Sequence, residues 1–260
     1  MTFFVVGFPR SGTTLLSVLL DRHSRLCVTP ETAFFDEVAP QLRANDDARL
    51  GIVLRKWRRL PELRLDAEHV IAQLPRPWTP SDVLRAILDL YAEAHAKPRC
   101  GEKTPQHLNH ADTILRHFDD AKILCLVRDG RDAVLSLRAM PWFRGSLAAT
   151  AKMWKESVRI AEEHARKQSN RFTIVRYEDL IASPHEHLAL TMHFIGESFE
   201  PRQLDTSVAS DVVLPRSMEW KGRALGPITA DAQSRRESAR AEDVAYLDRV
   251  LHDDLQRLGY

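Results

Sequence analysis

Hydrophobic positions along the chain follow two alternating kinds of spacing. Short apolar runs have the length and composition of buried strands; they lie at residues 3–6, 26–29, just before Gly101, 122–127 and 172–176. Segments with helical spacing separate these runs, at residues 13–23, 81–96, 111–117, 131–140, 147–167 and 184–194. Strands that alternate with helices are typical of a mostly parallel sheet with helices on both faces. The pattern predicts a three-layer α/β fold in a single domain over residues 1–260.

Residues 41–97 interrupt this alternation. They show helical spacing and no clear strand, and prolines at positions 75, 77 and 80 punctuate them. We expect a helical insertion that caps the sheet. Residues 55–59 of this segment are strongly basic; a solvated helix face explains them, and a docking surface for an acidic molecule is the alternative.

Composition limits the partners that the chain can have. Lys and Arg total 37 against 36 Asp and Glu, a net charge of +1, which argues against a nucleic-acid partner bound through bulk electrostatics. The three cysteines show no metal-site or disulfide spacing and predict buried thiols. No secretory leader is visible, and no apolar run approaches the roughly 20 residues of a membrane span. The sequence therefore predicts a cytoplasmic protein with no membrane partner.

The segment after the first strand has the spacing of a phosphate-binding loop. Gly7 and Gly12 match G-x-x-x-x-G-K-[ST], except that Thr13 replaces the Lys that would reach the β- and γ-phosphates of a triphosphate. A nucleotide with a single 5′-phosphate group fits this loop better. The candidate binding residues are Arg10, Ser11, Gly12, Thr13, Thr14 and Leu15, through backbone N–H groups at a helix N-terminus and the two threonine hydroxyls. A strand, turn and helix without a ligand is the alternative.

A second strand, at residues 122–127, also runs into a tight turn and a helix. Arg128 comes directly after the strand, and Ser136 follows about two helical turns later. An Arg and a Ser hydroxyl together can bind a second phosphate through charge-assisted hydrogen bonds. Alternatively, Arg128 and Asp129 cap the helix and pair with each other.

These segments resemble sulfotransferases that use 3′-phosphoadenosine 5′-phosphosulfate (PAPS). PRSGTTLL at residues 9–16 resembles the 5′-phosphosulfate loop of that family, LVRDGRDAVLS at residues 126–136 its 3′-phosphate motif, and VRYEDL at residues 175–180 the segment near the adenine. The resemblance implies a P-loop-type fold, the product 3′,5′-bisphosphoadenosine (PAP), and no essential metal. It also implies that Tyr177 lies near the adenine and that Lys221 and Arg223 return over the donor.

The resemblance also indicates which residues act on the acceptor hydroxyl. Lys103 is followed by Pro105 rather than by a His two positions on, a form that resembles tyrosylprotein sulfotransferases and bacterial relatives. Their base corresponds to Glu31, which lies 21 residues after Arg10. The resemblance thus implies that Glu31 is the general base and that Lys103 and Arg10 stabilise the transferring group. His107 is the rival base, or a structural histidine.

The acceptor stays open at this stage. Glu31, the Lys103–Pro105 arrangement and the basic insertion favour a peptide tyrosine, with residues 41–97 on the acceptor side. The alternatives are a small-molecule or carbohydrate hydroxyl. More distant readings are a P-loop kinase, which predicts Lys at position 13 and bound Mg²⁺, and a non-catalytic nucleotide-binding module. The sequence does not determine the oligomeric state, and a dimer is compatible with it.

Overall fold

The protein is built around one five-stranded parallel sheet. The computed structural model describes residues 2–210, 212, 228 and 235–260. In that part of the chain the strand order is β2-β3-β1-β4-β5, and every pairing is parallel. The strands are β1 (Phe3–Gly7), β2 (Leu26–Val28), β3 (Arg99–Lys103), β4 (Lys122–Val127) and β5 (Phe172–Arg176). All five predicted strands are confirmed.

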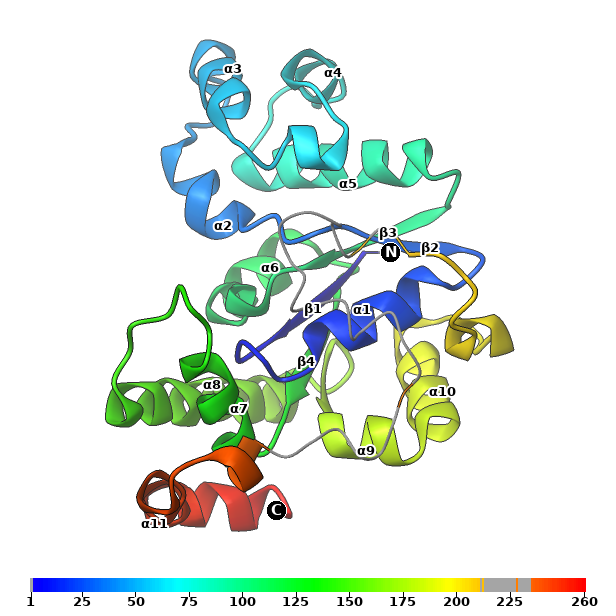
Figure 1. Ribbon diagram of the computed structural model, residues 1–260. Helices are drawn as coiled ribbons and strands as arrows, with labels where there is room; N and C mark the ends of the chain where they lie inside the picture. Colours follow the sequence, from blue (N-terminus) through cyan, green and yellow to red (C-terminus); the bar gives the residue numbers. More distant parts are fainter. Residues whose placement is uncertain (1, 211, 213–227, 229–234) are drawn as a thin grey trace.

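Helices cover both faces of this sheet, as predicted (Figure 1). Successive residues of a strand point to opposite faces, so Phe3 and Val5 join one hydrophobic core while Phe4 and Val6 join the other. The first core includes residues of α1 (Thr13–Asp21), α9 (Tyr177–Ala182) and α10 (Pro184–Ile195). The second includes residues of α5 (Pro80–Ala94), α6 (Ala111–His117), α7 (Gly130–Arg138), α8 (Leu147–Lys167) and α11 (Ala241–Arg257).

Residues 41–97 are helical and contain no strand. Before them lies the short helix α2 (Phe34–Glu37), and within them lie α3 (Asp47–Lys56), α4 (Ala67–Ala72) and α5. The indole N–H of the buried Trp78 donates to Asp47, 2.8 Å away, which ties the start of α5 to α3. Helix α5 packs beside β3, with α3 and α4 on its outer side (Figure 1).

The parallel topology decides where the candidate residues meet. Carboxyl ends of parallel strands share one edge of a sheet, and ligands of such folds bind there. Each strand leads, within a few residues, to a residue singled out from the sequence; these are Gly12 after β1, Glu31 after β2, Lys103 at the end of β3, Arg128 after β4 and Tyr177 after β5.

Candidate active site

The loop between β1 and α1 has the backbone that a phosphate-binding turn needs. Gly12 has φ +96°, and a Cβ there would lie 2.4 Å from Cδ2 of Tyr177, so no larger residue fits. Arg10 is also left-handed, with φ 73°. The hydroxyl of Ser11 is buried, and no described residue hydrogen-bonds to it. An orphaned buried hydroxyl beside the free N–H groups of a helix start suits an anion.

In the turn after β4, Asp129 caps the helix but does not pair with Arg128, which was the alternative for this motif. Asp129 caps α7 by accepting from the backbone N–H of Arg131 at 2.9 Å. Its carboxylate pairs with the side chains of Arg131, at 2.6 Å, and Arg236, at 3.3 Å. Arg128 is therefore not needed to neutralise Asp129 and can serve another group.

Arg128 turns toward the first loop instead. Its guanidinium lies 4.7 Å from the centre of the Tyr177 ring, and its Nη1 donates to the carbonyl of Arg10 at 3.3 Å. Its buried Nε has no hydrogen-bond acceptor in the described part of the chain. On the far side, the indole N–H of the buried Trp154 holds the Arg128 carbonyl at 3.2 Å. Arg128 thus presents a fixed, incompletely satisfied guanidinium to the loop between β1 and α1.

The two motifs meet in space although they are far apart in the sequence. Nε of Arg10 donates to the hydroxyl of Ser136 at 3.3 Å. Burial lowers the pKa of Arg10, and the positive charges of Arg128 and Arg235 lower it further, against a smaller opposing effect of Glu31. A partly buried cluster of guanidiniums favours an anionic ligand, which would relieve their mutual repulsion.

Glu31 and Lys103 form an ion pair close to this cluster. Nζ of Lys103 lies 2.9 Å from Oε1 of Glu31. The Lys103 side chain is 1% exposed, whereas that of Glu31 is 21% exposed and can reach a molecule in solution. Lys103 is therefore no solvated surface lysine, and Glu31 is no isolated loop carboxylate.

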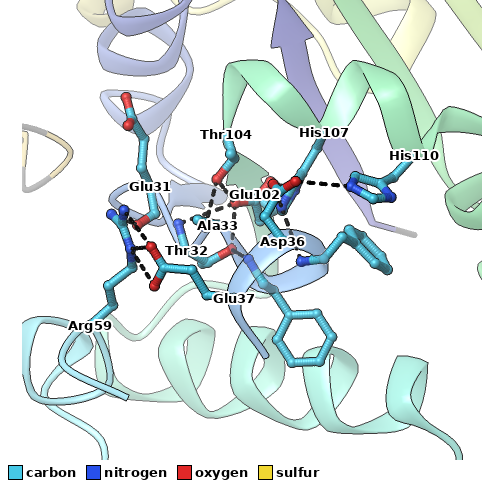
Figure 2. Close-up of polar contacts among 12 residues, drawn as sticks. Glu31, Thr32, Ala33, Asp36, Glu37, Arg59, Glu102, Thr104, His107 and His110 are labelled. Carbon is cyan, nitrogen blue, oxygen red and sulfur yellow. Dashed lines mark hydrogen bonds and ion pairs between the residues drawn. The ribbon is translucent and has the colours of Figure 1, made fainter. Parts of the chain in front are cut away.

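A second, fully buried carboxylate fixes the loop that carries Glu31 (Figure 2). Glu102 accepts from the hydroxyl of Thr32 at 2.7 Å, from that of Thr104 at 2.6 Å, and from Nδ1 of His107 at 2.9 Å. Burial alone would raise the pKa of Glu102, but the electrostatic attraction of the His107 ring and these hydrogen bonds lower it overall. Glu102 therefore stays ionised inside the protein.

The position of His107 argues against the rival base. The side chain is fully buried, with Nδ1 on Glu102 and Nε2 accepting from the backbone N–H of Phe35 at 3.3 Å. Both ring nitrogens are thus engaged within the protein, and the imidazole has the environment of a structural histidine.

Arg59 does not lie on a solvated helix face, which was the expectation for the basic residues 55–59. Its side chain is only 16% exposed and points inward, where Nη1 donates to the main-chain carbonyl of Glu31 at 2.8 Å and the guanidinium pairs with Glu37 at 3.1 Å (Figure 2). Arg55, by contrast, is exposed and pairs with Glu68 at 2.8 Å. One residue of the stretch therefore serves the candidate site rather than a solvated face.

Two of the predicted donor-binding residues, Lys221 and Arg223, lie outside the described residues. Sequence reasoning missed the roles of Glu102, Arg59 and Arg236. An acidic residue inside an otherwise buried strand could have drawn notice to Glu102. Nothing in the local sequence distinguishes Arg59 from its basic neighbours.

A turn through Gly12 follows a parallel strand and leads into a helix, and Arg10 and Arg128 lie beside it. This arrangement is that of a P-loop-type nucleotide-binding fold. The chain belongs to the sulfotransferase family, whose family model matches residues 2–201. Members of this family use PAPS and act on acceptor hydroxyls.

Individual relatives agree with this assignment. The chain is 26% identical to a protein-tyrosine sulfotransferase of Drosophila melanogaster over 89% of its length, and 24% identical to protein-tyrosine sulfotransferase A of Caenorhabditis elegans over 99%. It spans 46% and 66% of the length of these relatives.

Solved structures share the fold. The sulfotransferase domain from the curacin biosynthetic pathway superposes with a TM-score of 0.63 at 21% identity, covering 96% of both chains. A mouse sulfotransferase complexed with PAP superposes with a TM-score of 0.53 at 14% identity, covering 98% of this chain and 83% of that one.

The relatives contradict one prediction. A cytoplasmic protein was expected from the sequence, whereas protein-tyrosine sulfotransferases are Golgi membrane enzymes. Within the described residues, none of the helices combines the length and apolar character of a membrane span.

Proposed function

We propose that the protein transfers a sulfuryl group from PAPS to an acceptor hydroxyl, and that the acceptor is a tyrosine of a peptide or protein. The observation that carries the proposal is the meeting of two distant motifs, with Arg10 bonded to Ser136 at 3.3 Å and Arg128 directed at the same loop. Two anion-binding elements at one sheet edge suit a nucleotide with phosphates on both the 3′ and the 5′ position. The names of the relatives favour tyrosine.

Donor binding is assigned to the edge where β1, β4 and β5 end. Backbone N–H groups of residues 12–15 and the hydroxyls of Thr13 and Thr14 hold the 5′-phosphosulfate at the start of α1. The N–H of Ser11 donates to the carbonyl of Phe8 at 3.2 Å, so Ser11 contributes its hydroxyl rather than its main chain. Arg128 and Ser136 hold the 3′-phosphate, and Tyr177 packs beside the adenine. The orphaned hydroxyl of Ser11 and the unsatisfied Nε of Arg128 support this fit.

Transfer chemistry is assigned to Glu31, Lys103 and Arg10. The acceptor oxygen forms a bond to sulfur while the bond from sulfur to the 5′-phosphate oxygen breaks, and the acceptor proton passes to the Glu31 carboxylate. Lys103 and Arg10 stabilise negative charge on the bridging oxygen and on the sulfuryl oxygens. Residues 41–97 belong to the same domain and face the acceptor, which the contact from Arg59 to Glu31 supports.

Calorimetry and kinetics test this proposal. PAP should bind in the absence of metal, and ATP with Mg²⁺ should bind much more weakly; tight binding of ATP with Mg²⁺ would favour the kinase alternative. Radiolabelled PAPS is then offered with a tyrosine peptide bearing acidic flanks, with simple phenols and with sugars, and the peptide should be labelled. Labelling of phenols or sugars alone would reassign the acceptor.

A single substitution then tests the general base. Glu31→Gln should lower kcat by about 10²-fold, the scale of general-base loss, and leave the Kd of PAP nearly unchanged. Glu62→Gln, at an exposed position, is the matched control. An unchanged kcat in Glu31→Gln would remove Glu31 from the base role.

A further inference from the structure

We propose that Arg59 and Glu102 are positioning residues that hold the peptide group between Glu31 and Thr32 from its two ends, and thereby aim the Glu31 carboxylate at Lys103. This inference rests on the proposed role of Glu31. The carbonyl of that peptide group accepts from Nη1 of Arg59 at 2.8 Å, and its N–H donates to Oε1 of Glu102 at 3.4 Å. Figure 2 shows the two residues on either side of the loop.

The loop needs such anchoring because its backbone is in an uncommon conformation. Ala33 has φ 47° and ψ 31°, in the left-handed region that residues with a Cβ rarely adopt. Strain of this kind persists only where the surroundings fix it. Here the N–H of Ala33 donates to the hydroxyl of Thr104 at 3.0 Å, and the hydroxyl of Thr32 donates to Glu102 at 2.7 Å.

The two anchors come from opposite directions. Glu102 precedes Lys103 on β3, so the strand that carries the lysine also holds the loop that carries the glutamate. Arg59 comes from the helical segment that we place on the acceptor side, and its guanidinium is held in turn by Glu37. Since Arg59 reaches Glu31 through its main-chain carbonyl, it acts through the placement of the carboxylate and takes no part in the chemistry itself.

A double-mutant cycle separates positioning from a structural role. Arg59→Met keeps the apolar stem of the side chain and removes both contacts. With the tyrosine peptide as acceptor, it should lower kcat measurably, by up to the roughly 10²-fold that a 1 Å misplacement of a catalytic group can cost. In the Glu31→Gln background the same substitution should change kcat less than twofold, because no carboxylate remains to be misplaced. The Kd of PAP should stay unchanged throughout.

The controls distinguish the possible failures. Arg55→Met removes the surface pair with Glu68 nearby and should leave kcat unchanged. Equal fold losses from Arg59→Met in both backgrounds would overturn the positioning role while the base role stands. An unaffected kcat in Glu31→Gln alone would instead remove Glu31 from the base role, and with it the premise of this inference.

A structural readout covers the case in which turnover is too slow to measure. In a crystal structure of Arg59→Met, the 2.9 Å contact from Lys103 to Glu31 should be lost or lengthened. Glu102→Gln should have the same effect if it folds. Retention of the contact in Arg59→Met would overturn the inference regardless of activity.

Discussion

Arg128→Ala is the sharpest test of the donor site, because its effect depends on one phosphate of the ligand. The guanidinium lies 4.7 Å above the Tyr177 ring, and its buried Nε has no acceptor among the described residues. If the 3′-phosphate completes this set of contacts, removing Arg128 penalises only nucleotides that carry it.

The magnitude follows from the contact that only the 3′-phosphate makes. A charge-assisted hydrogen bond contributes about 1.5–3 kcal/mol, which corresponds to a loss of roughly 10-fold to 150-fold in affinity for PAP. The contact between Arg128 and the Tyr177 ring is present in the ligand-free protein, so it adds nothing to this difference. AMP has the 5′-phosphate alone, so its affinity should stay nearly unchanged.

Titration calorimetry of PAP and AMP on both proteins measures this difference. Arg138→Ala is a suitable control, since that side chain lies at the end of α7, the helix that follows Arg128, and pairs with Asp243 at 3.8 Å. Equal losses for PAP and AMP in Arg128→Ala would refute the assignment of Arg128 to the 3′-phosphate and indicate a general distortion of the loop.

Two further outcomes follow from the same structure. Gly12→Ala introduces a Cβ at φ +96° and 2.4 Å from Tyr177, so it should lower the unfolding free energy by roughly 1–3 kcal/mol and weaken PAP binding. Urea unfolding measures the first effect and calorimetry the second, and wild-type values for both would contradict this account. Because the pKa of Glu102 is lower in the folded protein than its ordinary 4.5, its contribution to stability is present above about pH 4.5 and is lost as the pH falls through the folded-state pKa. Glu102→Gln should therefore weaken the acid dependence of the unfolding free energy, and an unchanged dependence would contradict that account.

The strands and the phosphate-binding loop could be predicted because their signals are local. Buried parallel strands are continuous apolar runs, and the glycine of the loop is required by a positive φ at one position. That the two loops lie at one edge could also be predicted, since parallel strands place their carboxyl ends together; the contact between Arg10 and Ser136 came from the structure. These features need no knowledge of side-chain packing.

The anchors of the Glu31 loop could not be predicted in the same way. Arg59 and Glu102 contact the loop across 28 and 70 residues of sequence, and nothing near either residue indicates the partner. Ala33 adopts a left-handed conformation, which a glycine at that position would have indicated but an alanine does not. Such contacts depend on how the helical segment packs against the sheet, which local spacing does not determine.

The placement of charge gives a physical reason why this loop suits a bisphosphate donor rather than a triphosphate. Thr13 stands where a cation would reach the β- and γ-phosphates, and positive charge comes instead from Arg10 and Arg128 beside the loop. We place the carboxylate of Glu31 where the β- and γ-phosphates of a triphosphate would extend, because its charge is close enough to raise the pKa of Arg10. A γ-phosphate there would meet a like charge. A sulfuryl group carries less charge, and the acceptor hydroxyl that attacks it is the group whose proton we propose to pass to Glu31. One residue can therefore both assist the transfer and exclude the commoner nucleotide.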